Sequence, residues 1–362
     1  SELSLQPLLD RSIFALSSGE KQKIATASVY AAGVEIYVLD EPSANLDRDG
    51  TEQLRQLLEK LKGQGKTVVI SEHKLYYLRD LADRVVWMRD GRIRRVFSGA
   101  EFAALSPQFL TEHGLRQTEL SKVPHSVPKV KAVPDAVRLE VFGLSFHYPG
   151  GKPLWQNVSF SCRGGEIVGI VGKNGAGKTT LCRGLMGLEK PSAGIIQLNG
   201  KSASKRQRRK ATFSVVQDVD YQLIAGSVAE ELRMGHERDP DMEEKIRQVL
   251  NRFSLGDYAD SHPTELSGGQ KQRLSIALAC LSGKKILFFD EPTSGLDAVN
   301  MALVRSSIVH LAESGCLCFV ITHDDEFTAG LFTSLLTIGQ DGTIRYQNAA
   351  EQDPNQLIQY DQ

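Results

Sequence analysis

Long hydrophobic runs are absent from this sequence of 362 residues. A helix needs about 20 consecutive apolar residues to span a bilayer, and no stretch approaches that length. The hydrophobic share of 41% is nevertheless ordinary for globular domains with packed cores, and the length suffices for two of them. We therefore expect folded domains that contain no membrane-spanning helix.

An excess of either charge sign is also missing. Lys and Arg together number 43, Asp and Glu number 44, and the formal net charge is -1. A balanced chain has no overall field that would draw it to nucleic acid or to an anionic lipid surface. Any such contact would have to depend on a local cluster of charge.

Cysteine is scarce, and its spacing is irregular. The five cysteines form no CxxC pair and no spacing that suits a zinc site. Cys316 and Cys318 alternate in and beside the apolar run 317–321, which predicts a buried strand. We interpret them as reduced core residues rather than metal ligands.

A series of short motifs occurs twice, and the two series are separated by a constant 250 residues. The segment LSSGE corresponds to LSGGQ, the triplet DEP and the pair LD each recur, and one histidine has a counterpart. A repeat at constant offset predicts two copies of one domain. The paired segments are 16–20 with 266–270, 40–42 with 290–292, 46–47 with 296–297, and His73 with His323.

The two predicted copies are unequal in length, because the long segment before Ser267 has no counterpart before Ser17. We interpret residues 1–121 as the second half of a first domain, 122–137 as a proline-bearing linker, and 138–362 as a complete second domain. A fragment of a longer protein explains the short first copy, and a degenerate half-domain is the alternative. In both cases the strand expected at 36–39 would expose an edge and apolar side chains.

Short apolar strands alternate with helices in the second copy. Residues 165–171, 286–289 and 318–321 have the length and composition of strands, and 178–186 has the pattern of a helix begun by a glycine-rich loop. Strands that are apolar on both sides imply parallel pairing with cover on both faces. We therefore predict an α/β fold, in which ligands gather at the carboxyl ends of the strands.

Residues 172–179 read GKNGAGKT and fit the phosphate-loop (Walker A) pattern GxxxxGK[ST]. The glycines let backbone N–H groups wrap a phosphate chain at a helix N-terminus. Lys178 would meet the β- and γ-phosphates, Thr179 would offer a hydroxyl to Mg²⁺, and Thr180 lies toward the α-phosphate. A chance glycine-rich turn is the alternative, which the strand–loop–helix context disfavours. The predicted nucleotide-binding residues are Asn174, Gly175, Ala176, Gly177, Lys178, Thr179 and Thr180.

Polar residues follow the predicted strands 286–289 and 318–321 and the segment 213–216. Asp290 is placed to hold Mg²⁺, and Glu291 can polarise an attacking water. Gln217 offers an amide to the ion and the water, and His323 can steady the γ-phosphate or that water. A solvated strand end is the alternative, but the same carboxylates and histidine recur in the first copy. The predicted catalytic residues are Glu291, His323 and Gln217, and the predicted metal ligands are Thr179, Gln217 and Asp290.

Two further features point to a nucleotide. Tyr148 precedes the phosphate loop by the distance expected of an aromatic that stacks on a purine, although a structural strand-end tyrosine is possible. Residues 266–270 open an apolar-periodic helix and present a hydroxyl and bare amides at its positive end. A second anion site is redundant within one domain, and it makes sense if it completes ATP bound to another copy.

In order and spacing these motifs resemble the ABC ATPase family, and the resemblance covers nearly the whole chain. It implies the P-loop NTPase fold, ATP and Mg²⁺ as ligands, and hydrolysis of ATP to ADP and phosphate. It also implies a head-to-tail domain dimer, within one chain or between two, in which each ATP lies between one phosphate loop and the other copy's signature. The first copy's signature would supply Ser17, Ser18, Gly19 and Glu20. Because Ser18 replaces the glycine found at Gly268, the two sites are expected to differ.

Within that family the sequence is most similar to the fused ATPases of energy-coupling-factor transporters. The similarity is carried by QDVDYQ at 217–222, SEHKLYYL at 71–78 and LSSGEKQ at 16–22. It implies a peripheral protein at the cytoplasmic face of the cell membrane that powers import of a vitamin or metal ion. Its partners would be a transmembrane coupling subunit, docked near residues 218–224, and a membrane subunit that captures the substrate. The transported substrate is not specified by this chain.

Two other functional classes compete with transport. A soluble tandem ABC ATPase that acts on ribosomes or nucleic acid is favoured by the basic run KRQRRK at 205–210. A solvated helix face is the better account of that run, and the short linker differs from the long charged helix typical of ribosome-associated relatives. We therefore expect no nucleic-acid partner. An inactive scaffold is disfavoured because Lys178 and Glu291 are both intact.

Overall fold

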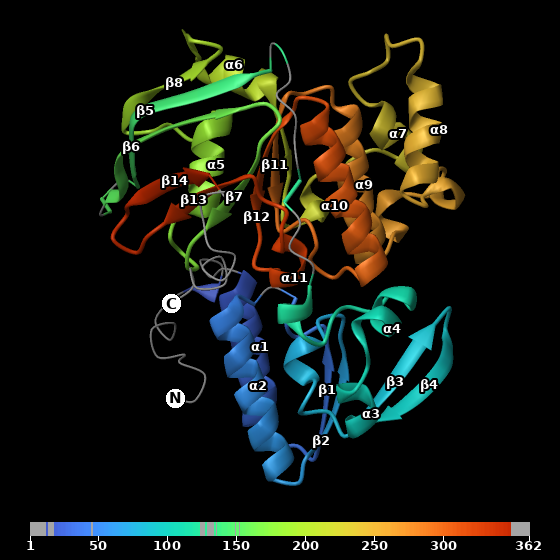
Figure 1. The fold of residues 1–362 in the computed structure, drawn as a ribbon. Helices are drawn as coiled ribbons and strands as arrows, with labels where there is room; N and C mark the ends of the chain where they lie inside the picture. The colour runs from blue at the N-terminus through green and yellow to red at the C-terminus, as the bar shows by residue number, and fades with distance from the viewer. Residues whose placement is uncertain are drawn as a thin grey trace. The chain divides into compact units, whose positions relative to one another are not determined.

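The computed structural model describes residues 12–13, 18–44, 46–123, 127–128, 134, 136–148, 150–151 and 153–348. They form two compact units, which we call unit 1 (up to residue 123, with 295–299) and unit 2 (124–294 and from 300 onward). Figure 1 shows the elements of each unit. Within the described ranges, no helix is both long enough and apolar enough to cross a membrane.

Unit 2 is built on a six-stranded sheet in the order β10-β11-β12-β7-β13-β14. Every neighbouring pair is parallel except β13 with β14. The inner strands are almost wholly buried, as their apolar sequences require. The strands are β7 (Ile167–Val171), β10 (Thr212–Val215), β11 (Ile286–Asp290), β12 (Leu317–Ile321), β13 (Ser334–Ile338) and β14 (Ile344–Asn348).

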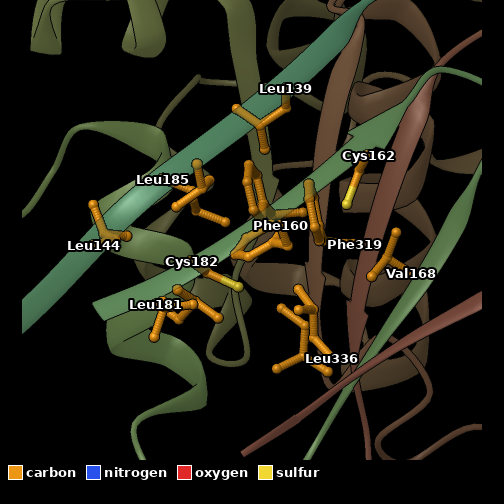
Figure 2. Packing of buried hydrophobic residues seen from close by; sticks show 14 of the residues in the cluster. Leu139, Leu144, Phe160, Cys162, Val168, Leu181, Cys182, Leu185, Phe319 and Leu336 are labelled. Carbon is orange, nitrogen blue, oxygen red and sulfur yellow. The ribbon is translucent and has the colours of Figure 1, made fainter. Parts of the chain in front are cut away.

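An antiparallel sheet in the order β6-β5-β8-β9 lies over one side of the main sheet, and one core joins the two. Figure 2 shows Leu144 of β5, Leu181 of α5 and Phe319 of β12 in the same cluster of buried side chains. Helix α5 is therefore fixed on both sides by packing, which also fixes its N-terminus. The elements are β5 (Arg138–His147), β6 (Pro153–Arg163), β8 (Ala193–Leu198), β9 (Lys201–Ser202) and α5 (Lys178–Met186).

In the rest of unit 2, α7, α8 and α9 pack on one another, and α9 contacts β10 of the main sheet. Further helices of unit 2 are α6 (Lys205–Ala211), α7 (Val228–Arg233), α8 (Met242–Arg252), α9 (Gly268–Leu281), α10 (Ala298–Glu313) and α11 (Asp325–Thr328). The described part of unit 2 also contains the short 3₁₀ turns η5 (Val219–Tyr221), η6 (Gly256–Tyr258) and η7 (Pro263–Glu265).

Unit 1 contains a parallel pair, β1 with β2, and an antiparallel hairpin, β3 with β4. Helix α2 buries Leu54, Leu57, Leu58 and Leu61, the i, i+3, i+4, i+7 spacing of one helical face. The strands are β1 (Ile36–Asp40), β2 (Thr67–Ser71), β3 (Arg84–Arg89) and β4 (Arg92–Ser98). The helices are α1 (Ser18–Ala31), α2 (Arg48–Gly63), η3 (Tyr76–Leu78), α3 (Gly99–Ala103), α4 (Pro107–Glu112) and η4 (Leu120–Lys122).

The sequence repeat is visible in the elements. Helix α1 and strands β1, β2 and β3 begin 250 residues before α9, β11, β12 and β13, and α2 begins 250 residues before α10. The cover over the repeated strands differs, however. Ile36 and Val38 of β1 are 63% and 72% exposed, whereas the matching Ile286 and Phe288 are 1% and 3% exposed. The apolar exposure predicted for residues 36–39 is thus confirmed at Ile36 and Val38, whereas Tyr37 is buried.

All five cysteines are free thiols, and Cys316 and Cys318 are buried as predicted. Burial raises the pKa of the Cys318 thiol well above its usual range. Among the residues that the structure places, no group of three or more His, Cys, Asp or Glu side chains could hold a metal ion. A packing role fits both observations.

Candidate nucleotide site

The phosphate loop runs from the end of β7 to the start of α5, as the sequence predicts. Gly172 and Gly177 have φ angles of 150° and 98°. A Cβ at either position would lie 2.5 Å from a neighbour, Ile338 O or Leu154 Cδ2 respectively. Gly177 caps α5 without any side-chain hydrogen bond. Gly177 thus places no side chain at the helix N-terminus, where backbone N–H groups favour a bound anion.

Lys178 is buried and folds back over its own loop. Its ammonium donates to the carbonyl oxygens of Gly172 (2.6 Å) and Lys173 (3.2 Å). These bonds hold the positive charge inside the loop, where a bound phosphate chain would meet it.

Thr179, in the first turn of α5, meets Asp290, the last residue of β11. Thr179 Oγ1 donates to Asp290 Oδ2 at 3.0 Å. Burial raises the pKa of Asp290, an effect that the Thr179 hydrogen bond and the Lys178 charge oppose. Two adjacent oxygen ligands about 2.1 Å from one Mg²⁺ lie about 3.0 Å apart, so this pair fits one Mg²⁺ coordination shell. Gln217 follows β10, whose Val215 pairs with Phe289, and so reaches the same edge of the sheet.

Glu291 has an unusual backbone, with a φ of 50°. Its N–H donates to Ile321 O (2.8 Å), which ties the residue to the end of β12. Its Oε2 accepts hydrogen bonds from Thr322 Oγ1 (3.1 Å) and from the His323 N–H (3.4 Å). The imidazole Nε2 of His323 lies 3.9 Å from Oε1 of Glu291. The strained turn therefore aims the predicted base toward the predicted histidine.

Tyr148 is half exposed beside the phosphate loop. Its hydroxyl shares a hydrogen bond of 2.9 Å with Thr180 Oγ1, and Phe146 packs edge-on against its ring. The ring thus has an accessible face close to the loop, which is compatible with stacking on a purine.

The signature of unit 2 is an N-terminal cap. Ser267 and Gln270 form a reciprocal pair, in which each backbone N–H donates to the other side chain. Of the matching residues in the first copy, Ser17 lies outside the described residues, Ser18 and Gly19 begin α1, and Glu20 follows in its first turn. Their predicted contact with ATP stays a prediction.

Residues 218–224 directly follow Gln217 and display some of their side chains at the surface, although Val219 is buried. Tyr221 is 85% and Ile224 is 75% exposed. Two contacts tie the segment to neighbouring helices. Asp220 pairs with Lys271 of α9 at 2.6 Å, and the Ile224 N–H donates to Glu231 of α7. Two large apolar side chains are therefore displayed on a braced loop.

The basic run 205–210 is partly structural. Arg208 is buried with Nη1 3.5 Å from Ala203 O, and Arg209 Nε donates to Gly187 O at the end of α5. These two guanidinium groups hold α6 in place, which leaves fewer cations to meet a phosphate backbone.

Sequence reasoning missed Thr322, whose hydroxyl contacts the predicted base. A signal was present, because the residue directly precedes His323 and is replaced by Glu72 at the repeated position. The left-handed backbone of Glu291 was also missed. The matching Glu41 has nearly the same φ, 43°, so both repeats share this backbone conformation.

A mainly parallel sheet with a phosphate loop and strand-end carboxylates defines a P-loop ATPase. The family model described as ABC transporter matches residues 155–294. An ABC transporter ATP-binding protein of Treponema denticola is 44% identical over 343 residues, which is 93% of this chain and 69% of that protein. The chain therefore belongs to the ABC transporter ATP-binding proteins. It is an ABC transporter ATPase, and its nucleotide is ATP.

Other relatives extend the comparison. The HMP/thiamine import ATP-binding protein YkoD of Bacillus subtilis is 31% identical, over 94% of this chain and 67% of its own length. The structure of cbiO1 from Clostridium perfringens, part of the ABC transporter complex cbiONQ, is 25% identical with a TM-score of 0.54, over 62% of this chain and 92% of that one. The archaeal ribosome recycling factor aABCE1, solved with the ribosomal stalk protein aP1, is 25% identical with a TM-score of 0.65, over 99% of this chain and 69% of that one. The predicted α/β P-loop fold is confirmed.

Proposed function

We propose that this protein hydrolyses ATP to power an energy-coupling-factor transporter that imports a vitamin or a metal ion. The observation that carries the hydrolytic part is the group of polar residues at one edge of the sheet, where Thr179 meets Asp290 and Glu291 meets His323. Support for the transporter class comes from relatives, since YkoD is named for HMP/thiamine import and cbiO1 belongs to a transporter complex.

We further propose that units 1 and 2 are two ABC nucleotide-binding domains in tandem, the first of them incomplete, with the boundaries 1–121, 122–137 and 138–362. The elements repeated at a spacing of 250 residues support this division. One composite site would take its phosphate loop, Tyr148 and catalytic residues from the second domain and residues 17–20 from the first, within one chain or between two.

In the proposed reaction, the loop amides and Lys178 bind the phosphate chain. Thr179, Asp290 and Gln217 would hold Mg²⁺, which supplies neutralisation of phosphate charge when bound. Glu291 accepts the proton of the attacking water at its carboxylate, and His323 donates a hydrogen bond to the γ-phosphate from beside that base. Tyr148 positions the purine.

The proposed partners are a transmembrane coupling subunit and a membrane subunit that captures the substrate, met at the cytoplasmic face of the cell membrane. Tyr221 and Ile224 are the proposed anchors, because large exposed apolar side chains on a braced loop suit a protein interface. Their position next to Gln217 would link partner movement to the metal and water.

This assignment predicts loss of partner binding in a Tyr221→Ser/Ile224→Ser double variant. Detergent-solubilised membranes should yield a polytopic partner with the wild-type protein, and at least about tenfold less with the variant, because two central anchors are lost. Ile195→Ser is the matched control, since Ile195 is a half-exposed apolar residue of β8, outside this loop. Equal recovery with the double variant and the wild type would remove these residues from the interface.

A soluble ATPase that acts on ribosomes is the second candidate, because the aABCE1 likeness extends over 99% of this chain. The structural use of Arg208 and Arg209 weighs against it. The same purification separates the two proposals, since recovery of ribosomes in place of a membrane protein would favour the second.

A further inference from the structure

The two repeats differ on both sides of their histidine. Unit 2 has Thr322 and Asp324 around His323, and unit 1 has Glu72 and Lys74 around His73. The catalytic glutamates are otherwise set alike, because Glu41 also has a left-handed φ and its N–H also donates to the end of the next strand, at 2.8 Å. The exchange therefore alters the surroundings of the base and not its backbone.

In unit 2 two different side chains perform two different tasks. Thr322 donates its hydroxyl hydrogen to Glu291 Oε2. Asp324 braces the loop, because its Oδ2 accepts from Thr293 Oγ1 at 3.0 Å and its Oδ1 caps α11 through the Phe327 N–H. Thr293, Thr322 and Asp324 are all buried. The brace leaves the Thr322 hydroxyl available to the base.

In unit 1 the loop is held by Glu72, which precedes the histidine, whereas in unit 2 it is held by Asp324, which follows the histidine. Glu72 accepts from Ser43, the counterpart of Thr293, through both Oγ (3.0 Å) and N–H (3.4 Å). It also accepts from the N–H groups of His73 and Lys74, each at 3.1 Å, and from the Tyr77 hydroxyl at 2.9 Å. A carboxylate that accepts five hydrogen bonds has no hydrogen to give to Glu41.

The exchange also places a like charge near Glu41. Burial raises the pKa of Glu41, the neighbouring carboxylates of Glu72 and Asp40 raise it further, and His73, whose Nε2 lies 3.6 Å away, lowers it. The ammonium of Lys74 is bonded to Ser43 O at 3.2 Å. The charge balance around Glu41 thus differs from that around Glu291, which has a hydroxyl at the matching position.

We propose that the residue before the histidine is a positioning residue for the catalytic glutamate: Thr322 holds Glu291 through its hydroxyl, whereas Glu72 braces the loop and leaves Glu41 without that donor. The two repeats therefore surround their glutamates differently, and this difference is independent of the one at Ser18. This inference rests on the proposed role of Glu291 as general base.

The first test compares Thr322→Val, which removes the hydroxyl at nearly constant size, with Thr322→Ser, which keeps it. Steady-state ATP hydrolysis of the purified protein gives kcat and KM, and Glu291→Gln marks the turnover that is left without this base. The Val variant should have a kcat about tenfold or more below that of the wild type, close to the kcat of Glu291→Gln. Its KM should be unchanged. The Ser variant should retain most of the wild-type kcat.

The proposal is overturned if Thr322→Val keeps wild-type turnover, or if the Ser and Val variants lose it equally together with ATP affinity and thermal stability, as a purely structural residue would. Wild-type turnover by Glu291→Gln is a different result, because it would remove the base itself and with it the proposed function.

The second test concerns unit 1 and needs no turnover. The carboxyl ¹³C shift of Glu41, assigned by its loss in Glu41→Gln, is followed against pH. Glu72→Gln keeps an acceptor but removes the charge, so the Glu41 midpoint should move to lower pH. Glu59→Gln, on the exposed face of α2, is the control and should leave it in place. An unmoved midpoint in Glu72→Gln would show that Glu72 does not act on Glu41.

Discussion

Asp290 illustrates at the level of one residue how a binding site conflicts with stability. The carboxylate ends a buried strand, and burial raises its pKa above the value in an unfolded chain. A raised folded pKa means that the folded state favours the protonated acid, so its contribution to stability is present at low pH and is lost as pH rises through the folded pKa. Above that pKa, and without a metal ion, the buried Asp290 carboxylate therefore lowers the free energy of unfolding.

We accordingly expect Asp290→Asn to raise the free energy of unfolding by about 1 kcal/mol at pH 7 and to abolish Mg²⁺-dependent ATP binding. The stability gain should shrink as pH falls toward the titration range of the acid. Urea unfolding at several pH values, combined with nucleotide titration, measures both effects. A variant that is less stable than wild type at pH 7 would show that the carboxylate's hydrogen bond with Thr179 outweighs its desolvation.

At the level of elements, the sequence is most informative where composition alone decides the structure. The strands at 286–289 and 318–321 could be predicted because every side chain in them is apolar, and they are buried on both faces. Helix α5 could be bounded because glycines with positive φ precede and follow it. Lys178, Asp290 and His323 lie at or just beyond the ends of these elements, so their positions could be predicted from the same patterns.

Strand order could not be predicted, because it depends on contacts between residues far apart in the chain. Strand β12 lies between β11 and β7, so the carboxylates and the phosphate loop belong to strands that are not neighbours. The hydrogen bond from Thr322 to Glu291 joins the residues that directly follow β12 and β11, and it could not be predicted for that reason. The sequence marks Thr322 only by its place before His323 and by its exchange for Glu72 in the repeat, and neither feature identifies the group that its hydroxyl contacts.

The repeated strands allow one substitution to be tested in two environments. Ile36→Thr changes a side chain that is 63% exposed, and Ile286→Thr changes its counterpart, which is 1% exposed. We expect the first to alter the free energy of unfolding by less than about 0.5 kcal/mol and the second to lower it by about 2–4 kcal/mol. Denaturant titration of both variants provides the comparison. Equal losses would mean that β1 is covered in solution.

For the whole molecule, the decisive count is one phosphate loop beside two signature segments in the sequence. This chain should therefore bind one ATP. Lys178→Ala should reduce the affinity for ATP by about 100-fold or more, because the variant lacks the ammonium group that would contact the phosphates. Isothermal titration calorimetry gives both the stoichiometry and the affinity. Lys210→Ala, which removes an exposed lysine at the end of α6, is the matched control. A second equivalent of ATP bound by the chain would contradict this count.

The source of the signature that completes this ATP site follows from concentration dependence. If residues 17–20 of the same chain reach the phosphate loop, turnover per chain is independent of protein concentration. If a second copy supplies them, turnover per chain rises with concentration until the dimer saturates, because association obeys mass action. Mixing Lys178→Ala with Ser17→Ala chains separates the cases. If the site forms between two copies, the Lys178→Ala chain supplies an intact signature to the intact phosphate loop of the Ser17→Ala chain, and hydrolysis is restored. If each site forms within one chain, every chain carries one defect and the mixture stays inactive.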